Sequence, residues 1–129
     1  MVDSREGKAG MTKLAGRRIL IVEDEALVAM LVEDALLDAG AEVIGPVATV
    51  AEAMALLDAA APDAAVLDLN LAGETSTPVA DVLATRGVPF VVATGYGAEG
   101  LPPGHASVPV LAKPYDPDEL TSTLSRICR

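Results

Sequence analysis

The chain has 129 residues, a length that suits one domain with a hydrophobic core of its own. Hydrophobic residues make up 51% of it, but there is no Trp, one Phe and two Tyr, so we expect a core of Ala, Val and Leu. The formal net charge of -10 and the lack of a basic stripe argue against a nucleic-acid partner, because phosphate binding needs clustered Lys and Arg.

The cysteine count and the apolar runs bear on the compartment. Cys128 is the single cysteine, so no internal disulfide can form, which is typical of a reducing compartment. The apolar run 19–22 is too short to cross a bilayer or to serve as a signal-peptide core, and acids follow it at once. We therefore expect a cytoplasmic protein that has no membrane segment.

The first 16 residues are rich in Gly, Lys and Arg and have no periodicity, which predicts a flexible leader ahead of a domain at 17–129. The short apolar run 18–23 ends in acids and is typical of a buried parallel strand. Apolar residues at helical spacing predict a first helix over 26–39, with Gly40 as its left-handed stop.

A second strand is predicted at 42–46. After it, Thr49 and Glu52 form a capping-box pattern before an Ala- and Leu-rich helix that Pro62 ends. A third apolar strand is predicted at 64–69.

Thr77 followed by Pro78 predicts the N-cap and first turn of the next helix, which Gly87 closes. A fourth strand follows at 88–93. Residues 95–109 hold four glycines and three prolines, so the fourth helix of the pattern is expected to be short or irregular.

The pattern ends with a strand at 108–112 and a helix at 116–127 that has Pro117 in its first turn. Five strands thus alternate with helices, which predicts an α/β fold with a doubly wound parallel sheet covered on both faces. Ligands of such sheets bind at the carboxyl ends of the strands.

Polar residues stand at four of these strand ends. Asp24 follows the first strand, the third strand carries Asp68 near its end with Asn70 just beyond it, Thr94 follows the fourth strand and Lys113 the fifth. A cluster of carboxylates repels itself unless a cation neutralises it. Mg2+ is the natural candidate, because it takes carboxylates, a backbone carbonyl such as that of Asn70, and a substrate phosphate as ligands.

Each of these residues also has an ordinary interpretation. Asp24 and Glu25 would favour a helix N-terminus, Thr94 would be a loop hydroxyl and Lys113 a solvated charge. Asp68 differs, because a carboxylate inside an apolar strand is costly to bury without partners. The conjunction at several strand ends favours a functional site.

The chain resembles the receiver domains of two-component response regulators from about Arg17 to its C-terminus. The pieces that carry the resemblance are Ile-Leu-Ile-Val-Glu23-Asp24-Glu25, Ala-Ala-Val-Leu-Asp68-Leu-Asn70-Leu, Val-Val-Ala-Thr94-Gly and Ala-Lys113-Pro-Tyr. The resemblance implies a flavodoxin-like sheet of strand order 2-1-3-4-5.

The resemblance also implies roles for single residues. Asp68 would be the phosphoacceptor, Glu23 and Asp24 the acidic pocket for Mg2+, Thr94 the switch hydroxyl and Lys113 the contact to the phosphoryl oxygens. The phosphodonor would be a sensor histidine kinase or a histidine phosphotransferase of a bacterial two-component system.

Phosphorylation adds about two negative charges, which would draw in Thr94 and Lys113 and reshape the fourth helix, the fifth strand and the fifth helix. Because the pattern ends with the fifth helix, we expect a stand-alone receiver. It would act by docking an unknown protein near Tyr96 to Tyr115.

The chain departs from the common receiver pattern at two places. Val110 stands three residues before Lys113, where many receivers have an aromatic residue that rotates on activation. The run Val-Ala-Thr94-Gly-Tyr96 is similar to the motif of FAT GUY receivers, although Val92 replaces the phenylalanine and Tyr96 directly follows the glycine.

Three alternatives stay open. An aspartate-nucleophile phosphatase would combine similar groups, but Asn70 stands where its second Asp is needed as general acid. A flavodoxin-like mononucleotide binder would need a Gly-rich phosphate loop, and acids stand there instead. A phosphate sink or kinase competitor would share every site residue with a signalling receiver.

The sequence predicts a signalling domain and not a turnover enzyme, with at most self-phosphorylation from small phosphodonors and autodephosphorylation. His105 lies in the Gly- and Pro-rich stretch and is interpreted as a solvated loop residue with no role in phosphate relay.

Overall fold

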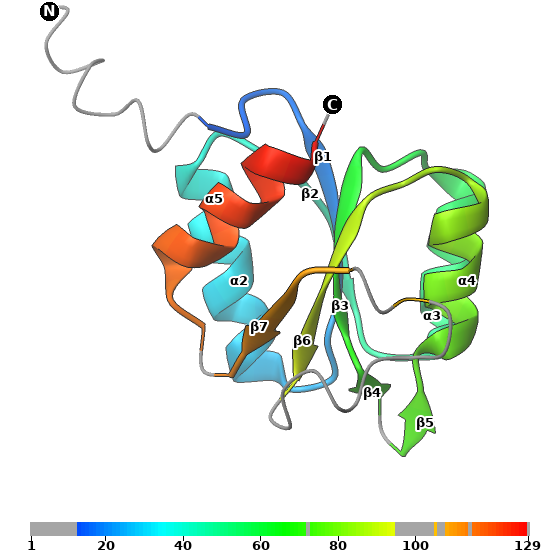
Figure 1. Cartoon of the computed structure of the whole chain (residues 1–129). Helices are drawn as coiled ribbons and strands as arrows, with labels where there is room; N and C mark the ends of the chain where they lie inside the picture. The colour runs from blue at the N-terminus through cyan, green and yellow to red at the C-terminus, as the bar shows by residue number, and fades with distance from the viewer. Residues whose placement is uncertain (1–12, 72, 95–104, 106–107, 114, 129) are drawn as a thin grey trace, which may run out of the picture.

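The computed structural model describes residues 13–71, 73–94, 105, 108–113 and 115–128. Its centre is a five-stranded parallel sheet of order β2-β1-β3-β6-β7 (Figure 1). The strands are β1 (Arg18–Val22), β2 (Glu42–Val47), β3 (Ala64–Asp68), β6 (Phe90–Thr94) and β7 (Val110–Ala112). Because β6 and β7 are the fourth and fifth strands of this sheet in chain order, the predicted order 2-1-3-4-5 is confirmed.

Four helices in the described part of the chain cover the two faces of the sheet. They are α2 (Ala26–Asp38), α3 (Val50–Ala59), α4 (Thr77–Thr85) and α5 (Pro117–Ile127). The pair α2 and α5 lies on one face and the pair α3 and α4 on the other (Figure 1). The predicted doubly wound architecture is therefore confirmed.

The strand β1 shows why both faces are buried. Ile19 and Ile21 belong to the core cluster under α2 and α5, while Leu20 and Val22 belong to the cluster under α3 and α4. Successive side chains of a strand point to opposite faces, so a strand without polar alternation must be covered twice. As expected from the composition, Leu, Val, Ile and Ala dominate the buried set, and Phe90 is its one aromatic hydrophobic residue among the described positions.

The start of α3 follows the predicted capping box, and the start of α5 has a side-chain cap that was not predicted. The Thr49 hydroxyl oxygen accepts a hydrogen bond from the Glu52 N–H at 3.1 Å, and Glu52 in turn accepts one from the Ala48 N–H at 3.0 Å. At α5, the Asp116 carboxylate accepts from the Asp118 N–H at 3.0 Å. These bonds satisfy backbone N–H groups that a helix leaves without partners.

The predicted N-cap at Thr77 is wrong by one residue. Thr77 is already helical, and Ser76 is the N-cap of α4. The buried Ser76 hydroxyl does not cap the helix but donates to the Leu69 carbonyl at 3.0 Å. Ser76 thus ties the start of α4 to Leu69, the residue that follows β3, a contact that the capping pattern does not reveal.

Residues 13–16, which precede the predicted domain boundary at residue 17, contact the domain. Leu14 is fully buried in the cluster under α2 and α5, and its N–H donates to the Ala39 carbonyl at 3.0 Å. The Gly16 N–H donates to the Gly40 carbonyl at 3.2 Å. Residues 13–16, which were predicted to be part of the flexible leader, therefore pack against the domain, and residues 1–12 lie outside the described residues.

A short antiparallel hairpin, β4 (Asn70–Leu71) and β5 (Glu74–Thr75), follows β3 and was not predicted. Gly73 has a φ of +88°, a left-handed conformation that glycine adopts without strain. The predicted short or irregular fourth helix falls almost wholly on residues 95–104 and 106–107, which lie outside the described residues. No described helix is long and apolar enough to span a bilayer.

Candidate functional site

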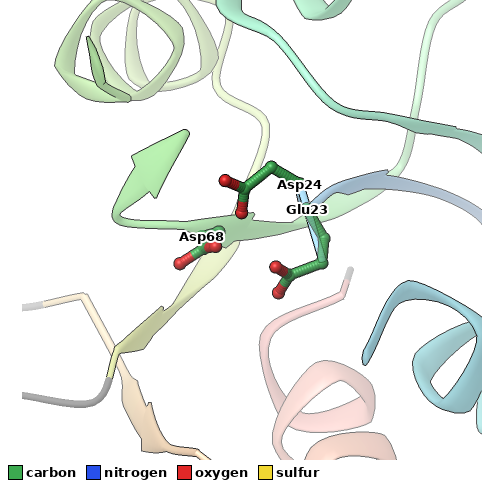
Figure 2. A group of neighbouring side chains, drawn as sticks. All are labelled: Glu23, Asp24 and Asp68. Atoms are coloured by element: carbon green, nitrogen blue, oxygen red, sulfur yellow. The ribbon is translucent and has the colours of Figure 1, made fainter. Parts of the chain in front are cut away.

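The carboxyl ends of β1 and β3 bring three acids together. Glu23 and Asp24 directly follow β1, and Asp68 is the last residue of β3, its hydrogen-bonded neighbour. One carboxylate oxygen from each of the three lies within 4.8 Å of the others (Figure 2). The clustering predicted from the strand ends is thus what the fold produces.

Lys113, just beyond β7, reaches into this acidic cluster. Its Nζ lies 3.0 Å from Asp68 Oδ2, 3.0 Å from Glu23 Oε1 and 3.1 Å from Glu25 Oε1. The lysine backbone is fixed by β6, since its N–H donates to the Thr94 carbonyl at 3.1 Å. One cation therefore compensates several carboxylates in this cluster.

Glu23 and Asp68 are both buried, with exposed fractions of 3% and 6%. Burial raises the pKa of Glu23 to about 7, and a hydrogen bond with Asp68 acts in the same direction. Burial alone would lower the pKa of Lys113, but its bonds to Glu23, Asp68 and Glu25 outweigh burial and raise it. Lys113 is therefore a permanent cation, whereas Glu23 changes its charge near neutral pH.

The donor set fits a hard divalent cation. Its ligand atoms are carboxylate oxygens, which Mg2+ prefers. Glu23 Oε1 is buried and, among the described residues, has no partner in hydrogen-bonding geometry although the Lys113 charge is near. A second positive charge at this position would relieve both the repulsion and the orphaned oxygen.

Two further predicted residues lie at the same edge. Thr94, at the end of β6, is 3% exposed. Asn70 begins β4, two residues after Asp68, and its side-chain oxygen accepts from the Gly73 N–H at 3.1 Å. The fold thus brings every predicted site residue to the carboxyl edge of the sheet.

The contact between Glu25 and Lys113 was not predicted from the sequence. Glu25 was interpreted as a residue that favours the α2 N-terminus, yet it makes no side-chain cap bond there. The signal that could have indicated this pair is that Glu25 and Lys113 carry opposite charges at the same edge of the predicted sheet.

The interpretation of His105 as a solvated residue is wrong. His105 is 8% exposed, its Nε2 lies 2.8 Å from Asp81 Oδ1, and its ring packs edge-on against Phe90 with centroids 5.7 Å apart. The physical reason is that packing against Phe90 and the contact with Asp81 on α4 compensate the imidazole for its lost hydration.

Comparison with known proteins decides the family. The model of the response regulator receiver domain matches residues 19–125 of this chain. The chain belongs to the response regulator receiver family. Receivers of this family bind Mg2+ at an acidic pocket, and their partners are histidine kinases or histidine phosphotransferases of two-component systems.

Several known receivers are similar to this one. The structure of SdrG from Sphingomonas melonis is 44% identical, with a TM-score of 0.77, over 91% of this chain and 98% of SdrG. The response regulator PhyR from Brucella abortus is 28% identical, with a TM-score of 0.79, over 98% of this chain and 53% of PhyR. The transcriptional regulatory protein PdtaR of Mycobacterium tuberculosis is 31% identical over 66% of this chain, which spans 42% of PdtaR.

Two details of the receiver remain predictions. Val110, at the position of the rotating aromatic residue of many receivers, is half-buried at the start of β7. Tyr96, on which the FAT GUY interpretation partly depends, lies outside the described residues.

Proposed function

We propose that this receiver accepts a phosphoryl group on Asp68 from a histidine kinase or a histidine phosphotransferase. The observation that carries the proposal is the position of Asp68, whose Oδ2 lies 3.0 Å from Lys113 Nζ and whose carboxylate shares a cluster with Glu23 and Asp24. A cation beside a carboxylate cluster is suited to hold the charge that a phosphoryl group brings.

The chemistry is an in-line displacement at phosphorus. A carboxylate oxygen of Asp68 forms the new P–O bond while the P–N bond to the donor histidine breaks, and the leaving imidazole takes up a proton. Because the charge of the transferring group is spread over its oxygens, the protein acts mainly by positioning and by charge compensation.

Mg2+ would be held by Asp24 and Asp68, with Glu23 completing the acidic pocket, and would supply charge neutralisation during transfer. The side-chain oxygen of Asn70 already accepts the Gly73 N–H, which leaves the Asn70 backbone carbonyl as the group proposed for the metal. Lys113 would bind a phosphoryl oxygen on the side away from the metal.

The response would pass from the site to the surface through Thr94 and Lys113. Thr94 ends β6, Lys113 lies just beyond the neighbouring strand β7, and a backbone hydrogen bond of 3.1 Å joins them, so a shift of one moves the other. A downstream protein is proposed to dock near Tyr96 to Tyr115, a range of which the structure describes residues 105, 108–113 and 115. The exchange would take place in the cytoplasm, and the domain would act as a phosphoacceptor without general turnover.

Intact mass after treatment with acetyl phosphate and Mg2+ tests the proposal. Wild type is expected to gain one phosphoryl adduct that disappears without Mg2+ and in Asp68→Ala. Asp38→Ala, which removes an exposed acid at the far end of α2, is the control and should label as wild type does. Equal labelling of Asp68→Ala would disprove the assignment, and sustained hydrolysis of the donor would favour a phosphatase instead.

A further inference from the structure

The side chain of Glu25 is engaged in an unusual way for its position. Glu25 is the N-cap residue of α2, but its side chain caps nothing. Its Oε1 lies 3.1 Å from Lys113 Nζ instead. The Glu25 backbone is held in place, because its N–H donates to Glu23 Oε2 at 3.0 Å.

The hydrogen-bonding capacity of Lys113 is fully used in this arrangement. An ammonium group carries three N–H donors. Lys113 donates to Asp68 Oδ2 at 3.0 Å, to Glu25 Oε1 at 3.1 Å and to Glu23 Oε2 at 3.2 Å. A phosphoryl oxygen that needs a donor from Lys113 must therefore displace one of these carboxylates.

Burial decides which carboxylate leaves. The Glu23 and Asp68 side chains are 2% and 8% exposed, so a lost cation would leave their charges without compensation in a site poor in water. The Glu25 side chain is 62% exposed and is hydrated again at little cost. Asp68, moreover, is the residue that would carry the phosphoryl group.

We propose that Glu25 is a positioning residue of the resting state, which holds Lys113 among the carboxylates and gives way when a phosphoryl group arrives on Asp68. The inference rests on the proposed phosphoacceptor function and adds a regulation of the same site. Glu25 thus opposes activation, because it competes with the phosphoryl group for Lys113.

The test is the affinity for beryllium fluoride, a phosphoryl mimic, measured at saturating Mg2+ so that metal binding does not limit it. Glu25→Gln removes a contact that exists in the resting state alone, so the variant should bind the mimic about two- to fivefold more tightly than wild type, as for loss of one exposed ion pair. In Glu25→Gln, Lys113 can contact the mimic without first breaking an ion pair with residue 25.

Glu42→Gln is the matched control. Glu42 is also exposed and also pairs with a cation, Arg18 at 3.6 Å, but it stands at the opposite end of the strands. Its substitution changes the net charge by the same amount, so an unchanged affinity in Glu42→Gln separates the contact with Lys113 from a general charge effect.

A second readout uses the protein without mimic or metal. The ammonium protons of Lys113, followed by nitrogen-detected NMR, should exchange faster with water in Glu25→Gln than in wild type. If wild type binds the mimic but Glu25→Gln binds it equally or less tightly, the role of Glu25 is disproved and the phosphoacceptor function stands. If wild type fails to bind the mimic, the proposed function itself fails.

Discussion

At the scale of single residues, Lys113 is the cation on which the charge balance of the site depends. Lys113→Met leaves Glu23 and Asp68 buried without their cation, so we expect the metal-free protein to lose about 3 kcal/mol of unfolding free energy. Mg2+ should restore part of this loss, because the metal replaces the missing positive charge. Urea unfolding with and without Mg2+ measures both effects.

Lys13→Met is the control for this experiment. The Lys13 ammonium donates to the Ser122 hydroxyl at 2.7 Å and contacts no carboxylate among the described residues. Its replacement should change stability by less than about 0.5 kcal/mol, with no dependence on Mg2+. An equal loss in the two variants would show that Lys113 is an ordinary surface lysine.

The raised pKa of Glu23 makes the stability of the metal-free protein depend on pH. Below the ordinary pKa of 4.5 the carboxyl group is protonated in both the folded and the unfolded chain, so burying it costs no ionisation and stability is not reduced by this group. Between pH 4.5 and the folded value of about 7, only the unfolded chain ionises, and stability falls. The loss from this group reaches roughly 3 kcal/mol at most.

Unfolding in EDTA at several pH values between 5 and 8 checks this expectation. Glu23→Gln has no proton to lose, so its stability should fall less than that of wild type over the same range. Added Mg2+ should flatten the wild-type profile, because the metal favours the ionised carboxylate. Parallel profiles for wild type and Glu23→Gln without metal would contradict the assignment of the raised pKa to Glu23.

At the scale of elements, α2 carries the large exposed hydrophobic residues that the described part of the chain has. They are Leu27, Met30, Leu31 and Leu37, all more than one third exposed. Met30 also lines a groove of about 460 Å³ that extends to Glu23 and Asp24. The N-terminal half of α2 therefore offers an apolar surface beside the acidic cluster, where a phosphodonor protein would approach Asp68 under the proposed function.

Substitutions on this helix separate docking from chemistry. The donor is a histidine kinase that phosphorylates the wild-type protein. Leu31→Glu should lower the rate of phosphotransfer from this kinase by about tenfold or more, as loss of an interface anchor does. Labelling by acetyl phosphate should not change, because a small donor needs no docking surface. Leu37→Glu, about 9 Å further along the helix, is the control with a smaller effect. Equal loss with both donors would point to damage of the site.

The link between His105 and α4 is a second contact between elements. Asp81→Ala removes the partner of a nearly buried imidazole, and we expect a loss of about 1 to 3 kcal/mol of unfolding free energy. A double-mutant cycle with His105→Ala measures the coupling, which should be at least 0.5 kcal/mol in order of magnitude. Strict additivity would show that the two side chains act independently.

At the scale of the whole molecule, strand and helix order was predictable because apolar runs and caps repeat along the chain. The acidic cluster was predictable for the same reason, since parallel strands deliver their carboxyl ends to one edge. Three features depend on the folded structure and escaped prediction: the burial of Leu14, the bond from Ser76 to Leu69 and the pair of Glu25 with Lys113. Local patterns carry no record of such partners.

Leu14 provides the last test, because it decides where the domain begins. Its side chain is fully buried with Leu36 and Leu124 between α2 and α5, so Leu14→Ala should cost about 2 to 5 kcal/mol of unfolding free energy. Leu37→Ala, at a site 52% exposed, is the control and should cost about 0.5 kcal/mol or less. Equal midpoints of urea unfolding for the two variants would show that Leu14 does not contribute to the core, in line with the predicted boundary at residue 17. A loss confined to Leu14→Ala extends the cooperative core to a residue that precedes the first strand.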